Sequence, residues 1–93
     1  MINLDRKTYK EIDFDIAKRI IKLCKRKKIS QRDLALKSSV SYASIKRFEQ
    51  TGEISLGSLT KIAIALDVDK QLDNLFDNVP FNSIEEVINE QNK

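Results

Sequence analysis

Histidine and tryptophan are absent from this sequence of 93 residues, which has one cysteine, one proline and two glycines. Without histidine, the chain lacks the commonest general base and the commonest metal ligand of proteins. The single cysteine, Cys24, excludes an intramolecular disulfide, and alone it makes neither a nucleophilic pair nor a zinc site. Two glycines form no phosphate-binding loop. These absences predict a protein that is not an enzyme and that holds no metal ion and no cofactor.

Long apolar runs are also lacking. No run approaches the roughly 20 residues of a membrane span, and the N-terminal stretch contains no apolar signal-peptide region. A lone cysteine fits a reducing compartment. We therefore expect a cytoplasmic protein without a membrane partner. The apolar content of 41% allows one small core, and domains of this size often gain stability by associating.

Charge is distributed unevenly along the chain. Residues 1–66 carry 15 lysines and arginines against 7 acidic residues, whereas residues 67–93 carry 2 against 7. The segment 18–37 alone has nine basic residues and one acidic residue. A basic body suits a polyanionic partner such as nucleic acid, because charge supplies the sequence-independent part of DNA affinity. The alternative is a lysine-rich face that is simply solvated.

Apolar spacing and capping residues predict an all-α chain. The first helix is expected at about 15–27, with Asp13 or Asp15 as its cap. Ser30 and Asp33 form a capping box for the second helix, and serines at 41 and 55 cap the third and fourth. The third helix is expected at 42–50, the fourth carries apolar residues from 56 to 66, and a fifth follows Asp69 and ends before Pro80.

The predicted boundaries divide the chain into three parts. Residues 1–12 have no clear helical period and are expected to form an N-terminal arm. Residues 13–78 hold the five helices, and residues 79–93 form an acidic tail whose Ser83 opens a short helix.

The second and third helices form a pair joined by a short polar break at 38–41. Because Ile45 and Phe48 must face the core, the opposite face of the third helix is polar and partly basic. The residues expected on or near that outer face are Tyr42, Ala43, Ser44, Lys46 and Arg47. Such a helix fits the major groove of double-stranded DNA, where an arginine can bind O6 and N7 of guanine. Tyr42 and Ala43 suit contact with a thymine methyl group.

The run from Ser30 to Glu49 resembles the helix-turn-helix of the Xre/Cro family of phage and bacterial repressors. Shared points include Gln31 at the start of the second helix, Ala35 at a close helix contact, and Val40-Ser41 before the third helix. The segment 55–66 resembles the family's fourth helix, and the likeness extends over residues 16–76. It implies a five-helix lambda-repressor-like domain that binds operator DNA as a homodimer and regulates transcription, most commonly as a repressor.

The resemblance also implies roles for single residues. The family's base-reading positions fall on Tyr42, Ala43 and Arg47, with Ser44 and Lys46 close by. The expected phosphate contacts are Gln31, Ser41 and Thr51, the first two at helix N-termini that favour anions. Three of these residues have a structural alternative: a helix start for Gln31, a helix cap for Ser41 and a solvated side chain for Lys46.

Three positions depart from the family pattern. Ser39 stands where the turn usually has glycine, so it must adopt a left-handed conformation or shift the turn. Cys24, expected in the core, stands where the family commonly has an arginine that pairs with the acidic residue at Glu49. We therefore expect Glu49 to bind Lys27 or a backbone donor. The loop at 50–54 is about one residue shorter than usual, which puts its phosphate contacts in doubt.

The segment 48–56 also resembles regulators encoded beside HipA-type kinase toxins. This likeness implies an alternative function, an antitoxin that binds a toxin kinase and represses its own operon. The acidic region 67–90 or the outer helices would then hold the toxin. The residues expected in a dimer interface are Leu72, Leu75, Phe76, Val79 and Phe81, with closure of the monomer core as the alternative.

Overall fold

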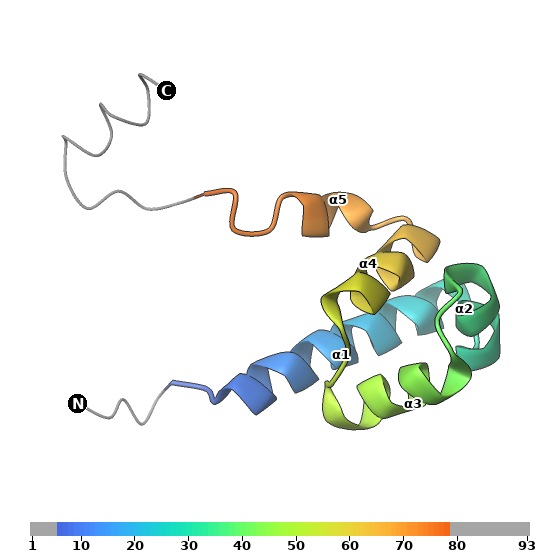
Figure 1. The fold of residues 1–93 in the computed structure, drawn as a ribbon, viewed down its shortest axis with the longest axis horizontal. Helices are drawn as coiled ribbons and strands as arrows, with labels where there is room; N and C mark the ends of the chain where they lie inside the picture. Colours follow the sequence, from blue (N-terminus) through green and yellow to red (C-terminus); the bar gives the residue numbers. More distant parts are fainter. Residues whose placement is uncertain (1–5, 79–93) are drawn as a thin grey trace, which may run out of the picture.

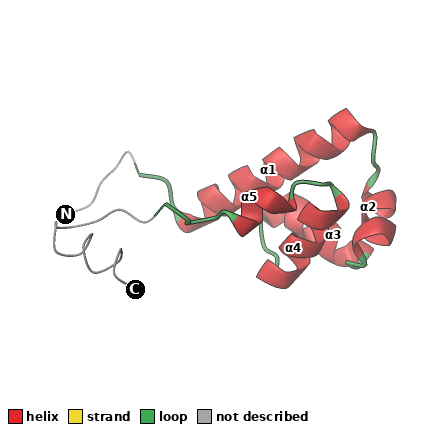
Figure 2. Cartoon of the chain, turned by 90° about the horizontal axis from the view of Figure 1, so that it is seen from above, coloured by secondary structure: helices red, strands yellow, loops and turns green. Residues whose placement is uncertain are grey.

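The computed structural model describes residues 6–78, which form helices only (Figures 1 and 2). These helices are α1 (Tyr9–Lys27), α2 (Gln31–Ser38), α3 (Tyr42–Thr51), α4 (Leu56–Ala65) and α5 (Asp69–Asp73). The predicted all-α class and the five helices are confirmed for this part of the chain. The short helix predicted after Ser83 lies outside the described residues.

Serine side chains start α2, α3 and α4 as the sequence predicts. Ser30, Ser41 and Ser55 each have extended backbone angles, and each hydroxyl accepts the backbone N–H three residues later at 3.1 Å. In α2 the carboxylate of Asp33 also accepts the N–H of Ser30 at 3.4 Å, which completes the capping box. These bonds satisfy N–H groups that a helix N-terminus leaves unpaired. The starts of three helices are therefore encoded locally.

The predicted start of the first helix is wrong. α1 begins at Tyr9 and is capped by Thr8, whose hydroxyl accepts the N–H of Glu11 at 3.2 Å. Asp13 and Asp15 are not caps, and residues 9–12 of the predicted arm are helical. The spacing of apolar residues did not predict the first turn of α1, because its Tyr9 and Ile12 are exposed and lie outside the apolar face. The Thr-x-x-Glu pattern at 8–11 is a start signal that could have identified it.

The fifth helix is shorter than predicted and has no side-chain cap. Asp69 is its first helical residue rather than its cap, and Val68 stands before it without a capping hydrogen bond. The helix ends at Asp73, so Leu75 and Phe76 lie beyond it. Phe76, three residues beyond the end of the helix, has a positive φ of 61°. The apolar spacing predicted a helix that continues through these two residues. That prediction is wrong: Leu75 is 51% and Phe76 83% exposed, so burial of an apolar face does not stabilise helix here.

The core lies between α1, α2, α3 and α4. Its largest fully buried side chains are Phe48, Ile45, Ile62 and Leu66. Ile45 and Phe48 occupy the inner face of α3, as predicted, and α3 packs against α1 (Figure 1). Burial of one apolar face is the main term that fixes a short helix. It also determines which side of α3 is left exposed.

The turn between α2 and α3 is closed by two serines. The hydroxyl of Ser38 donates to the carbonyl of Leu34 at 2.6 Å and accepts the N–H of Val40 at 3.2 Å. Ser39 adopts the left-handed conformation, with φ of 60°. Of the two alternatives for Ser39, the structure therefore takes the strained backbone and keeps the turn in place.

Gly52 joins the end of α3 to the side of α1. Its φ is 82°, and its N–H donates to the carbonyl of Phe48 at 2.7 Å. A Cβ atom at this position would lie 2.7 Å from the backbone of Asp13 and Phe14. Only glycine allows both the positive φ and this close approach. The approach is to the first half of α1.

Replacing Gly52 by alanine should therefore destabilise the fold by roughly 2–4 kcal/mol, because left-handed strain adds to a backbone clash. Urea denaturation followed by circular dichroism measures this loss. Gly57→Ala is the matched control, since a Cβ there meets nothing within 4 Å. That control should be neutral or gain up to about 1 kcal/mol from helix propensity. Equal stabilities of the two variants would contradict the docking of Gly52.

Candidate nucleic-acid interface

The outer face of α3 carries the predicted base-reading residues. Four of them are exposed, and Tyr42 is half-buried. The exposed four are Ala43, Ser44, Lys46 and Arg47. They face away from the core because Ile45 and Phe48 turn inward. The structure thus brings these five residues together on one helix, while their contacts with a ligand stay a prediction.

Two cations lie over the ring of Tyr42 at the start of α3. The guanidinium carbon of Arg32 lies 4.4 Å from the ring centre, and Nζ of Lys46 lies 5.4 Å from it. Both distances are within the range of cation–π attraction. Arg32 comes from α2, so the ring links the two helices and gathers positive charge where α3 begins. Arg32 was not among the residues predicted on this face.

The two serines of the first turn of α3 bind each other. The hydroxyl of Ser41 donates to Oγ of Ser44 at 2.7 Å and accepts the N–H of Ser44 at 3.1 Å. Ser41 is therefore a cap, as one of its two interpretations held. Its predicted phosphate contact is untested.

A hydrogen bond between the side chains of Gln31 and Glu49 joins α2 to α3. Nε2 of Gln31 donates to Oε2 of Glu49 at 2.6 Å, and both residues are half-buried. The predicted partners of Glu49, Lys27 or a backbone donor, are wrong. A half-buried carboxylate needs a donor, and α2 places the amide of Gln31 within reach. One of the two amide N–H groups of Gln31 is thus engaged within the protein, and its phosphate contact stays a prediction.

Cys24 lies beside this pair and packs against the core, where the sequence placed it. Partial burial raises the pKa of its thiol, and the negative charge of Glu49 raises it further. Both causes disfavour the thiolate.

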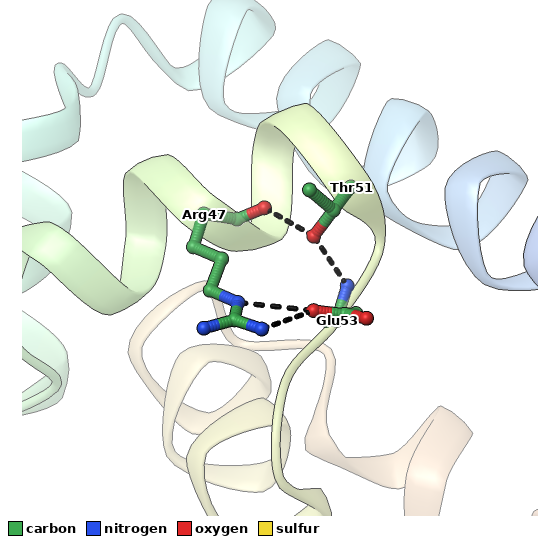
Figure 3. A network of polar contacts seen from close by, with 3 residues as sticks. All are labelled: Arg47, Thr51 and Glu53. Atoms are coloured by element: carbon green, nitrogen blue, oxygen red, sulfur yellow. Dashed lines mark hydrogen bonds and ion pairs between the residues drawn. The ribbon is translucent and has the colours of Figure 1, made fainter.

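A second polar network lies at the other end of α3, where Arg47, Thr51 and Glu53 meet (Figure 3). Nε and Nη2 of Arg47 donate to Oε2 of Glu53 at 3.0 and 2.5 Å. The hydroxyl of Thr51 donates to the carbonyl of Arg47 at 2.7 Å and accepts the N–H of Glu53 at 3.0 Å. Thr51 was predicted to contact phosphate, a role that is untested; here its hydroxyl ties the loop to the helix. Glu53 was predicted only as part of the turn after the third helix, with no role for its side chain.

Basic residues surround this face. All nine lysines and arginines of the segment 18–37 are exposed. They lie on the second half of α1, on the turn after it and on α2. An exposed cluster of this size creates a positive potential that attracts polyanions and is screened by salt.

Comparison with known proteins gives one family. Residues 20–72, more than half of the chain, match the helix-turn-helix family. No curated protein and no solved structure matches the chain. The matched segment runs from the middle of α1 into α5 and includes the whole α2–turn–α3 unit. Among the described residues, no helix is long and apolar enough to cross a membrane.

The raised pKa of Cys24 predicts slow alkylation. Because the thiolate is the reactive form, iodoacetamide at mildly alkaline pH should modify the folded protein more slowly than the denatured chain. Glu49→Gln should lower the pKa, and so speed the reaction, without restoring the ordinary value, since burial is the larger cause. Glu53→Gln is the control and should leave the rate unchanged. If Glu49→Gln reacts at the same rate as the unchanged protein, then the charge of Glu49 does not raise the pKa of Cys24.

Proposed function

Since the chain belongs to the helix-turn-helix family, of the Xre/Cro type, and this family consists of DNA-binding regulatory domains, we propose that it is a sequence-specific transcriptional repressor. In this proposal α3 enters the major groove of operator DNA. The observation that carries the proposal is the outer face of α3, where a polar and basic set of side chains stands opposite a fully buried apolar face.

The exposed side chains of α3 suit the reading of base edges. Arg47 extends from the middle of the helix with a side chain that is 70% exposed. Its guanidinium matches the two acceptors of guanine in the major groove. Ala43 and the ring of Tyr42 supply apolar contact for a thymine methyl group, and Ser44 and Lys46 supply hydrogen-bond donors beside them.

The proposed phosphate contacts lie at the edges of this face. The side chains of Gln31 and Ser41 are bonded within the protein, so we assign their contacts to the backbone N–H groups of the first turns of α2 and α3. Thr51 lies at the far end of α3, next to the loop. The exposed basic residues of α1 and α2 add the sequence-independent attraction.

Replacing Arg47 by alanine tests the assignment of the recognition helix. The change should cost about 1–3 kcal/mol on the preferred site and relax the preference at one base pair. Fluorescence anisotropy with labelled duplexes, measured over a range of salt concentrations, gives both quantities. Lys10→Ala removes an exposed charge from the first turns of α1 and should leave the sequence preference intact. An Arg47→Ala variant with unchanged affinity and preference would refute the assignment.

We propose further that the protein acts as a homodimer. Several large apolar side chains of α4 and of the segment after α5 are exposed, and together they line an open groove. These are Leu56 (68% exposed), Ile64 (61%), Leu75 (51%) and Phe76 (83%). Leu75 and Phe76 were among the predicted interface residues; Val79 and Phe81 lie outside the described residues. A dimer that places two recognition helices on one face of the DNA needs half-sites one helical turn apart, about 34–36 Å.

Phe76→Ser should therefore weaken self-association, because it removes the most exposed of these side chains. Light scattering at micromolar concentration should show a lower mean mass than that of the unchanged protein. Leu36→Ser is the control, since Leu36 is 82% exposed but lies on α2. Loss of association in Leu36→Ser instead would place the interface on the other side of the domain.

The alternative function, binding to a kinase toxin, stays a prediction. Much of the acidic region that would hold the toxin lies in residues 79–93, outside the described part of the chain.

A further inference from the structure

Glu53 places a carboxylate beside the side chain proposed to read a base. It is exposed, it follows the glycine that ends α3, and it binds only one edge of the guanidinium of Arg47. A negative charge at this place repels DNA phosphates, so it weakens the sequence-independent attraction that the rest of the basic surface provides. Sequence-independent attraction to DNA therefore does not explain why a carboxylate lies at this position.

The contact leaves the arginine free to bind in the way guanine requires. Nε and Nη2 face Glu53, whereas the third guanidinium nitrogen, Nη1, points away from it (Figure 3). A guanidinium carries five N–H donors in a rigid plane. With the Nε edge held by Glu53, the outer edge still presents one N–H from each terminal nitrogen. Two parallel donors are what O6 and N7 of guanine accept.

The position of Glu53 is itself fixed. Its N–H donates to the hydroxyl of Thr51, which donates in turn to the carbonyl of Arg47. The preceding Gly52 is docked against the backbone of α1, with no room for a side chain. The carboxylate is therefore attached to the same rigid end of α3 as the arginine that it binds.

The ion pair contributes orientation rather than stability in the free protein. Its two side chains are 70% and 57% exposed, and exposed pairs of this kind contribute little to folding. In a major groove the surrounding water is largely displaced, so the same contact becomes stronger. A long arginine side chain otherwise samples many rotamers, and holding it lowers the entropy that is lost on binding.

We propose that Glu53 is a specificity-determining residue: it holds Arg47 in the orientation that reads guanine and lowers the affinity for every other sequence. This inference rests on the proposed function. In this proposal the loop after α3 orients a base-reading side chain, whereas the family resemblance implies only contacts with the DNA backbone there.

The test begins with selection of binding sites from a random duplex library by the unchanged protein. Affinities of the unchanged protein, Glu53→Ala and Glu53→Gln are then measured on the selected site and on duplexes with each guanine replaced. Glu53→Ala should bind unrelated duplex DNA several-fold more tightly and lose about tenfold of its discrimination at one guanine, within the range of a bidentate contact. Glu53→Gln keeps an acceptor without the charge, and should keep part of the discrimination.

A double-mutant cycle assigns the effect to the arginine. In the Arg47→Ala background, Glu53→Ala should leave discrimination unchanged, because the side chain that it orients is gone. Glu11→Ala removes an exposed acidic residue from the first turn of α1 and serves as the charge control. Thermal unfolding of each variant confirms that it is folded.

Two outcomes overturn the inference in different ways. If Glu53→Ala binds all duplexes more tightly by one factor, with discrimination unchanged, then Glu53 only repels DNA and the orienting role is wrong. If the unchanged protein selects no site, sequence-specific binding itself fails, and the role of Glu53 fails with it.

Discussion

The contact between Gly52 and the backbone of α1 determines the shape of the proposed DNA-binding face. Gly52 ends α3, and its positive φ sets the direction in which the chain enters the loop. Its close approach also keeps the C-terminal end of α3 in contact with α1. No other residue type suits this position, because a side chain would need a strained backbone and would clash with Asp13 and Phe14. The orientation of α3, and with it the placement of Arg47, depends on this contact.

Polar contacts at the two ends of α3 have a different effect from the apolar core. Tyr42 with its cations and Arg47 with its carboxylate are exposed or half-buried, so they add little to stability. They restrict side chains that would otherwise be mobile. The core fixes the helix, whereas these contacts orient the groups that the helix presents, and orientation before binding favours specificity over bulk affinity.

The departures from the family pattern are compensated within the structure. Cys24 replaces the arginine expected beside Glu49, and the amide of Gln31 supplies the missing donor from a neighbouring helix. Ser39 replaces the usual glycine and takes the left-handed backbone itself, next to a turn closed by Ser38. In both cases a residue of α2, or of the turn that follows it, meets the requirement.

The sequence by itself determined the features that depend on neighbours in the chain. Serine caps, the polar turn, and the inward side of α3 follow from residues one to four positions apart, and all were predicted. The start of α1 is likewise encoded locally, by Thr8 and Glu11. It was not predicted, because the apolar residues of the first turn are exposed and do not extend the apolar face of the helix. Only the tertiary structure decided the partner of Glu49, the docking of Gly52 and the contacts of Arg32 and Lys46 with the ring of Tyr42. Apart from that of Lys46, which lies on α3 with Tyr42, these contacts join segments far apart in the chain, and their geometry exists only after the core has set the helices against one another.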